Sequence, residues 1–124
     1  TAAGIAARAV EAMQREFGCK PENLRAAIGP CISACCFETH ADVPEAMLAA
    51  LGEDAREAIR PAGDKYYVNL KRLNAIWLER AGVRQIDISA DCTACQPQRF
   101  WSHRIVGNHR GSLAAVIMLR EEER

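Results

Sequence analysis

The chain has 124 residues, and its 16 basic and 16 acidic side chains give no formal net charge and a sequence pI of about 6.8. This length suits one domain with a single hydrophobic core, and balanced charge argues against a dedicated nucleic-acid binder, which usually carries a basic excess. No apolar run approaches the roughly 20 residues needed to span a bilayer, and the N-terminus lacks the features of a secretory signal. We therefore expect a cytoplasmic protein without nucleic-acid or membrane partners.

The first quarter of the chain predicts a helix followed by a strand. Apolar side chains four residues apart place a helix over residues 3–17, and Gly18 is suited to end it. A short, largely apolar strand is expected over 24–28. Gly29-Pro30 breaks this strand, and a loop of small residues follows over 31–36.

The second quarter predicts another helix. Residues 41–51 have helical periodicity, with Asp42 as a candidate N-cap. Residues 53–59 extend the helix by one further turn, and 60–63, which contain a proline and a glycine, are expected to form a loop.

The third quarter contains the strongest helix signal. Residues 65–68 form a short extended piece, and Asn69 is well suited to cap a helix over 70–81. Alternation of apolar residues then predicts a strand over 83–89.

The last quarter predicts a closing β-hairpin that pairs about 99–105 with 112–119. The run from Leu113 to Leu119 is apolar throughout, which is typical of a central strand covered on both faces. The order of the predicted elements favours an α+β fold, with helices packed on a mixed sheet.

A window without acidic residues lies in this last quarter. From Cys92 through Arg120 there is no Asp or Glu, while four Arg and two His are present. Arg104 and Arg110 suit recognition of phosphate or carboxylate, because the planar guanidinium binds two oxygens at once. Trp101 offers an aromatic face for a purine, although an aromatic in the core or at its edge is the better explanation. An ordinary hairpin with a basic tip accounts for the same pattern.

Six cysteines, at 19, 31, 35, 36, 92 and 95, are expected to be reduced, because the chain is rich in aliphatic residues and has no secretory signal. Cys92 and Cys95 form a Cys-x-x-Cys pair that is half of a zinc site, but a standard second half is absent. Cys31, Cys35 and Cys36 could complete such a site only through folding, and a small zinc protein that uses Cys31, Cys35, Cys92 and Cys95 is one alternative interpretation. A redox pair is less well supported, since Pro97 follows where a helix should begin.

Several motifs together resemble one known family. They occur in the order and spacing of that family and end with a Gly-x-x-Ala-Ala-Val-Ile strand; the others are Ala27-Ile28-Gly29-Pro30-Cys31-Ile32, Cys36-Phe37-Glu38, Cys92-Thr93-Ala94-Cys95 and Phe100-Trp101-Ser102-His103-Arg104. On these residues the chain resembles the laccase-domain family, also called multicopper polyphenol oxidases and described as purine nucleoside phosphorylases.

The resemblance implies a three-layer α/β/α arrangement on a mixed sheet. It also implies a zinc-dependent enzyme that phosphorolyses adenosine, inosine and methylthioadenosine and deaminates adenosine, with purine nucleoside and phosphate as its small-molecule partners. The older family name implies a copper-linked polyphenol oxidase instead. A non-catalytic scaffold or binding domain that keeps the fold is a further alternative.

The resemblance also implies that residues 1–124 are the C-terminal half of a single laccase-like domain whose upstream half is missing. The family's metal ligands, a His, a Cys and a second His, precede a Thr-Ala-x-Gly-Ile segment, and this chain opens with Thr1-Ala2-Ala3-Gly4-Ile5. No cysteine here matches the ligand Cys. We therefore expect no metal or other cofactor in this chain alone, and little or no activity without the upstream half.

Three residues are the candidates for substrate or phosphate binding: Ser102, Arg104 and Arg110. Ser102 and Arg104 match the family's Phe-Ser-x-Arg segment, in which His103 stands where Tyr is usual. The later Thr-Gly-Arg element is changed to Arg110-Gly111-Ser112, so its arginine is displaced by two positions. Catalytic residues are not identified, and Cys92 and Cys95 remain a weaker alternative as metal ligands.

Overall fold

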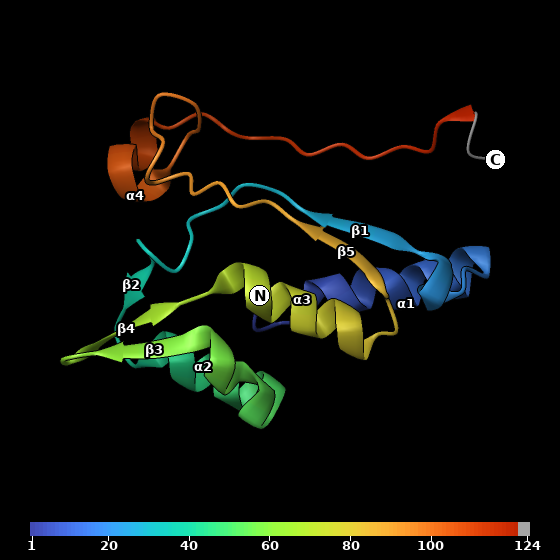
Figure 1. The fold of residues 1–124 in the computed structure, drawn as a ribbon, viewed down its shortest axis with the longest axis horizontal. Coiled ribbons are helices and arrows are strands. Elements are labelled where there is room, and N and C mark those ends of the chain that lie inside the picture. The colour runs from blue at the N-terminus through green and yellow to red at the C-terminus, as the bar shows by residue number, and fades with distance from the viewer. Residues whose placement is uncertain (122–124) are drawn as a thin grey trace.

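The computed structural model describes residues 1–121, and it divides them into four α-helices, three 3-10 segments and five short strands (Figure 1). No helix among these residues is long and apolar enough to cross a membrane. In chain order the elements are α1 (Ile5–Phe17), η1 (Pro21–Asn23), β1 (Arg25–Ile28), β2 (Glu38–Thr39), α2 (Asp42–Leu51), η2 (Gly52–Ala58), β3 (Ile59–Ala62), β4 (Lys65–Val68), α3 (Leu70–Arg80), β5 (Gln85–Ile88), α4 (His103–Val106) and η3 (Gly107–His109).

A two-stranded parallel sheet forms one half of the structure. β1 pairs with β5 over their full lengths, from Arg25 opposite Gln85 to Ile28 opposite Ile88. Helices α1 and α3 lie side by side along one face of this pair (Figure 1). Val10 of α1, Leu78 of α3 and Val83 are buried between the helices and the strands. Of the apolar side chains four residues apart that predicted α1, Ile5 and Phe17 are 67% and 78% exposed, so the helix is confirmed but its buried face is centred on Val10 instead.

A three-stranded antiparallel sheet forms the other half. Its order is β2-β4-β3, so β4 is the central strand. Helix α2 and the other side of α3 cover it, and they enclose a core in which Leu51, Val68 and Leu73 are almost fully buried. Because α3 contributes to both cores, it joins the two halves into one body.

Strand β3 occupies residues that the sequence predicts as a loop. The prediction relied on Pro61, which lacks the amide hydrogen that a central strand needs. β3 lies at the edge of its sheet, however, where proline is tolerated, and Pro61 lies opposite Tyr66 in the register. Proline marks the edge here.

The helix ends agree with the predictions except at α2. Gly18 adopts a left-handed conformation, with φ 64°, and ends α1, while the Asn69 side chain accepts a hydrogen bond from the Arg72 amide at 3.0 Å and caps α3. Asp42 is not the N-cap of α2 as predicted, because it is the first helical residue and Ala41 precedes it. Its carboxylate still lies in the first turn, where the helix dipole favours negative charge.

The predicted closing hairpin, 99–105 with 112–119, is wrong for the described residues. The carbonyl of Ser102 accepts the amides of Ile105 and Val106, at 3.2 and 3.0 Å, and this turns the segment into helix α4. Residues 110–120 run extended beyond α4 without a ladder partner among residues 1–121 (Figure 1). Val116 is 90% exposed, so the apolar run is not a covered central strand in this structure.

The mixed character of the fold is confirmed, since helices pack on parallel and antiparallel strands. The three-layer arrangement stays a prediction. The feature that positions the site is the parallel pair, because the carboxyl ends of β1 and β5 lie at the same edge and release two loops side by side.

Shortening a buried side chain of the shared helix α3 should destabilise the protein. Leu73 is fully buried in the core of the antiparallel half, so we expect Leu73→Ala to lower the free energy of unfolding by about 2–5 kcal/mol. Leu119→Ala is the matched control, since Leu119 is 66% exposed, and we expect it to change stability by less than about 0.5 kcal/mol. Urea unfolding followed by circular dichroism measures both, and equal effects would contradict the assigned core.

Candidate functional site

Two loops lie together at the carboxyl ends of β1 and β5. Residues 29–33 follow β1, and 89–93 follow β5. The Ser89 amide donates to the Ile28 carbonyl at 2.9 Å, and the Thr93 amide donates to the Cys31 carbonyl at 3.1 Å. A parallel bridge between Cys31 and Cys92 continues the strand pairing into the loops. The backbone therefore fixes the relative position of the two loops.

Lys71, at the start of α3, donates hydrogen bonds to the loop that follows β5. Its side chain is 6% exposed, and its Nζ donates to the carbonyls of Ser89 and Asp91, each at 2.7 Å. A buried ammonium group is unfavourable unless hydrogen bonds replace its water. These two carbonyls supply that replacement, and they fix the backbone immediately before Cys92.

A cavity of about 500 Å³ opens above these loops. Its walls include Pro30, Cys31 and Ile32 from the first loop and Thr93 from the second. Its opposite side is formed by the segment around α4. All three sequence candidates line this cavity: Ser102, Arg104 and Arg110.

The cavity lining carries two guanidinium groups. Arg104 and Arg110 supply them, His103 also lines the cavity, and no Asp or Glu does so among the described residues. Arg104 is held by its Nη1, which donates to the Glu38 carbonyl at 3.0 Å, and by its guanidinium, which lies 5.4 Å from the centre of the Phe37 ring. The bond to the Glu38 carbonyl uses one of the five donor hydrogens of the guanidinium, so the others can bind a ligand.

Glu38 connects this arginine to the antiparallel sheet. Its carboxylate accepts hydrogen bonds from Lys65 Nζ and from the Tyr67 hydroxyl, both at 3.1 Å. The bond from Lys65, followed by that from Tyr67, lowers the pKa of the Glu38 carboxyl below its ordinary value. The side chain of Glu38 is thus directed at β4, while its carbonyl faces Arg104.

Trp101 and Gly111 form the rim of the cavity in close contact. A Cβ at Gly111 would lie 2.7 Å from the indole Nε1, so no larger residue fits without moving the ring. Trp101 is 50% exposed at this position, and therefore it is an aromatic at the cavity edge and not part of the core.

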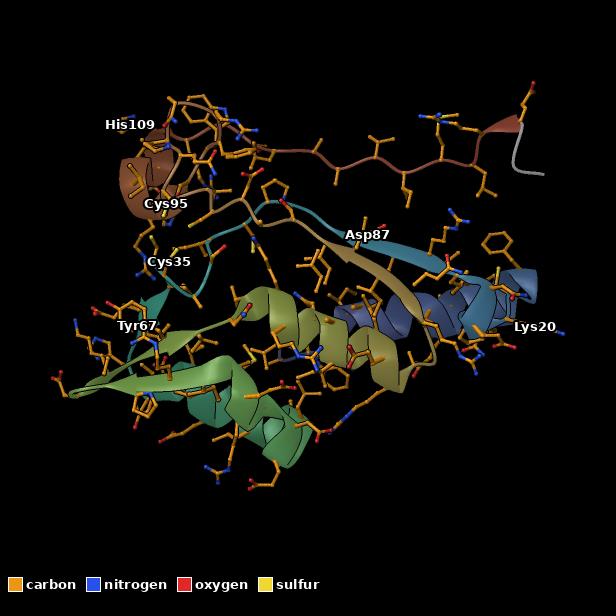
Figure 2. All side chains as sticks on the ribbon, in the orientation of Figure 1. Lys20, Cys35, Tyr67, Asp87, Cys95 and His109 are labelled. Atoms are coloured by element: carbon orange, nitrogen blue, oxygen red, sulfur yellow. The ribbon has the colours of Figure 1, made fainter. Side chains whose placement is uncertain are left out.

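Four thiols gather beside the cavity, on the same two loops. Cys35 and Cys36 lie in a turn whose Cys36 amide donates to the Ser33 carbonyl at 3.0 Å, and Cys92 and Cys95 come from the loop after β5. Cys95 Sγ is 3.6 Å from Cys35 Sγ and 3.4 Å from Cys36 Sγ, and all four sulfurs lie within 4.8 Å of one another. Figure 2 shows Cys35 and Cys95 on facing segments below α4.

The surroundings of Cys92 and Cys36 shift their pKa values in opposite directions. Burial raises the pKa of Cys92, but the backbone amides of Ser33, Cys95 and Ala94 outweigh it and hold the pKa at about 6. Hydrogen bonding to Cys95, and then to Cys35, raises the pKa of Cys36 to about 12. The buried member of this thiol cluster therefore carries the negative charge most readily.

The cluster differs from the set considered from the sequence. Cys31 is not a member, because its Sγ donates to the Ile32 carbonyl at 3.3 Å and its side chain lines the cavity. Cys36 takes its place. The sequence signal was available: a cysteine pair follows each of two strands, and a parallel pairing of those strands brings both pairs to one edge.

Histidines do not assemble with cysteines into a further group. Within residues 1–121, the thiol cluster is the only set of three or more His, Cys, Asp or Glu side chains close enough to share an ion. His103 points to the Asn108 side chain, with Nε2 3.2 Å from Oδ1. The cavity residues therefore do not form a three-ligand site for the catalytic metal that the sequence resemblance implies.

The comparisons with known proteins define the family. The family model for multi-copper polyphenol oxidoreductase laccase matches residues 1–120, and the chain belongs to this family. It is 30% identical over 127 residues to purine nucleoside phosphorylase LACC1 of Mus musculus, which covers 98% of this chain and 29% of that protein. It is 36% identical over 116 residues to purine nucleoside phosphorylase YfiH of Shigella flexneri, covering 94% and 47% respectively.

Solved structures agree with the fold. Hypothetical protein YfiH of Bacillus licheniformis superposes with a TM-score of 0.81 at 34% identity, covering 86% of this chain and 41% of that one. YlmD of Geobacillus stearothermophilus gives 0.78 at 32% identity, with 84% and 40% covered. The chain thus spans less than half the length of the relatives and structures described here.

The pairing of Glu38 makes a prediction about pH. Because its folded-state pKa is lowered, the carboxylate contributes stability above the ordinary glutamate pKa, and this contribution is lost as the pH falls through the lowered value. We expect the carbon-13 signal of this carboxyl to titrate below the ordinary range and Lys65→Met to move it back. Lys20→Met, at an exposed site, should leave it unchanged. An unshifted titration in the unmodified protein would contradict the pairing.

The contact of Lys71 makes a prediction about loop order. Lys71→Met leaves the Ser89 and Asp91 carbonyls without their donor, which costs about 1–3 kcal/mol. We expect the amides of Ser89 and Thr93 to exchange with solvent roughly tenfold faster or more, as measured by NMR. Lys20→Met is again the control. Unchanged exchange would show that the strand pairing alone orders the loop.

Proposed function

We propose that this chain is the C-terminal part of a purine nucleoside phosphorylase and that the cavity beside α4 binds the phosphate substrate. The observation that carries the proposal is the meeting of Arg104, Arg110 and Ser102 at one cavity free of acidic lining. Two considerations support it. The chain belongs to the laccase family, and the relatives named above are purine nucleoside phosphorylases.

Phosphorolysis requires an anion to be held close to a sugar. A phosphate oxygen forms a bond to the anomeric carbon of ribose while the bond from that carbon to the purine nitrogen breaks, and the proton lost by phosphate goes to the purine. Arginine suits this step because its fork holds two phosphate oxygens in a fixed orientation. In our proposal Arg104, already held by Glu38 and Phe37, orients the anion, and Arg110 neutralises its charge.

The remaining lining residues suit the nucleoside. Ser102 is 7% exposed and lies between the cavity and the first turn of α4, so its hydroxyl is placed to contact a ribose or phosphate oxygen. Trp101 offers the edge of the cavity an aromatic face on which a purine can stack. We propose adenosine, inosine and methylthioadenosine as substrates. Deamination of adenosine is a second reaction of the same proposal.

The residues that line this cavity do not form a set of three metal ligands. The zinc ligands of the proposed enzyme must therefore be residues outside the cavity lining. We propose that the rest of a longer chain supplies those ligands, which also explains our expectation that this chain alone has little activity. The cytoplasmic location remains a prediction.

A second candidate is favoured by one specific finding. The matching family model carries the description of a multi-copper polyphenol oxidoreductase. A phenol oxidase would need copper bound in the intact protein and would show no dependence on phosphate. A non-catalytic scaffold would show neither activity. Assays of phosphorolysis and of phenol oxidation distinguish these alternatives.

The test is phosphate-dependent release of adenine from adenosine, with added zinc, by this chain and by a longer chain that includes the residues preceding it in its gene. We expect activity in the longer chain alone. Arg104→Ala in the longer chain should raise the phosphate KM roughly 10- to 100-fold, because a hydrogen bond to a charged group contributes about 1.5–3 kcal/mol. Arg84→Ala, at an exposed site near β5, is the matched control.

The outcomes separate the candidates. An unchanged phosphate KM and kcat in Arg104→Ala and Arg110→Ala would contradict the role of this cavity. Oxidation of a phenol with copper and no phosphate dependence would support the second candidate. Absence of both activities in the longer chain would favour the scaffold.

A further inference from the structure

We propose that Cys35, Cys36, Cys92 and Cys95 bind one zinc ion in a closed, tetrahedral, structural site. This goes beyond the proposed function, because the phosphorolysis argued above makes no use of the four thiols. The proposal rests on the geometry of the sulfurs, on their chemical type and on the loops that carry them.

The separations of the sulfur atoms fit one tetrahedral ion. A zinc–sulfur bond of about 2.3 Å sets the edge of a regular tetrahedron of sulfurs at about 3.8 Å. The Cys36–Cys95 and Cys35–Cys95 pairs lie at 3.4 and 3.6 Å, and every pair lies within 4.8 Å. A disulfide would need its two sulfurs at about 2.05 Å. Small rotations of the side chains therefore convert the observed arrangement into a zinc site.

The donor set selects the class of metal. Four thiolates favour zinc or other thiophilic ions over magnesium and calcium, which prefer oxygen. The sulfurs lie too close together to enclose an iron–sulfur cluster, which would occupy the space between them. Four protein ligands also leave no open position for substrate, and this is typical of structural and not catalytic zinc.

The backbone around the cluster supports thiolate ligands. The Ser33 amide donates a hydrogen bond to Cys92 Sγ at 3.3 Å. Such a hydrogen bond stabilises the negative charge of a metal-bound sulfur. The turn at Ser33 places the two adjacent cysteines on the side that faces Cys95, since both sulfurs reach that one atom. Adjacent cysteines can therefore both be ligands here.

An entry path for the ion exists. Cys35 and Cys95 are exposed, while Cys92 is 5% exposed and is therefore the inner member of the cluster. Zinc can reach the outer thiols from solvent and then engage the inner one. The two pairs of ligands are about 60 residues apart in sequence. A bound ion would therefore close a long loop and connect the segments that follow β1 and β5.

The test is the zinc content of the purified, reduced chain, measured by inductively coupled plasma mass spectrometry. We expect about one zinc per chain, and near none in Cys95→Ser. Cys95→His should retain the zinc, because imidazole is also a zinc ligand. Cys19→Ser and Cys31→Ser are matched controls outside the cluster and should keep the full content. Cys95 is exposed, so its substitution leaves the cores intact.

Cobalt substitution gives an independent reading of geometry. After removal of zinc with a chelator, cobalt(II) should produce the intense visible bands of a tetrahedral site and the near-ultraviolet band of cobalt–thiolate bonds. Both should be weakened in Cys35→Ser and unchanged in Cys19→Ser. A chain that binds neither ion, zinc that persists unchanged in Cys95→Ser, bound iron instead of zinc, or a Cys36–Cys95 disulfide in the freshly prepared protein would each overturn the proposal.

Discussion

The hydrogen bonds of Lys71 are the interaction on which the site depends. A charged ammonium group lies buried under the loop that follows β5, and it donates to the carbonyls of Ser89 and Asp91. Removing such a charge from water is costly unless polar groups surround it. The loop thus supplies the acceptors that the lysine needs, and the lysine fixes the path of the loop. This contact therefore also fixes the positions of Cys92 and Thr93, the next two residues.

Much of the local structure was predictable because its causes are local. The periodicity of α1 and α3, and the Asn69 cap, depend on residues a few positions apart. The pairing of β1 with β5 joins residues about 60 positions apart, and nothing in either strand specifies its partner. The hairpin prediction was wrong for the same reason. An apolar run indicates a preference for burial, but it does not show which strand would provide its ladder.

The two parts of the site were predictable to different degrees. Ser102, Arg104 and Arg110 were selected from the sequence, two of them by resemblance, and the structure places all three on one cavity. Their binding roles remain proposals. The membership of the thiol cluster was predicted only in part, because the choice between Cys31 and Cys36 depends on the turn at Ser33 and on the direction of each side chain. Sequence spacing does not contain that information.

The cavity and the thiol cluster are built on the same two segments of the chain, and their charges therefore affect one another. Cys36 is followed by Phe37 and Glu38, which hold Arg104, and Cys92 is followed by Thr93 in the opposite wall. A zinc ion with four thiolates would carry two negative charges next to a cavity proposed to bind phosphate. Lys71 and the amides that donate to Cys92 offset part of that charge from the interior side. Arg104 and Arg110 line the cavity itself, whereas none of the four cluster cysteines does so, and an anion bound there would therefore contact the arginines and not the thiolates.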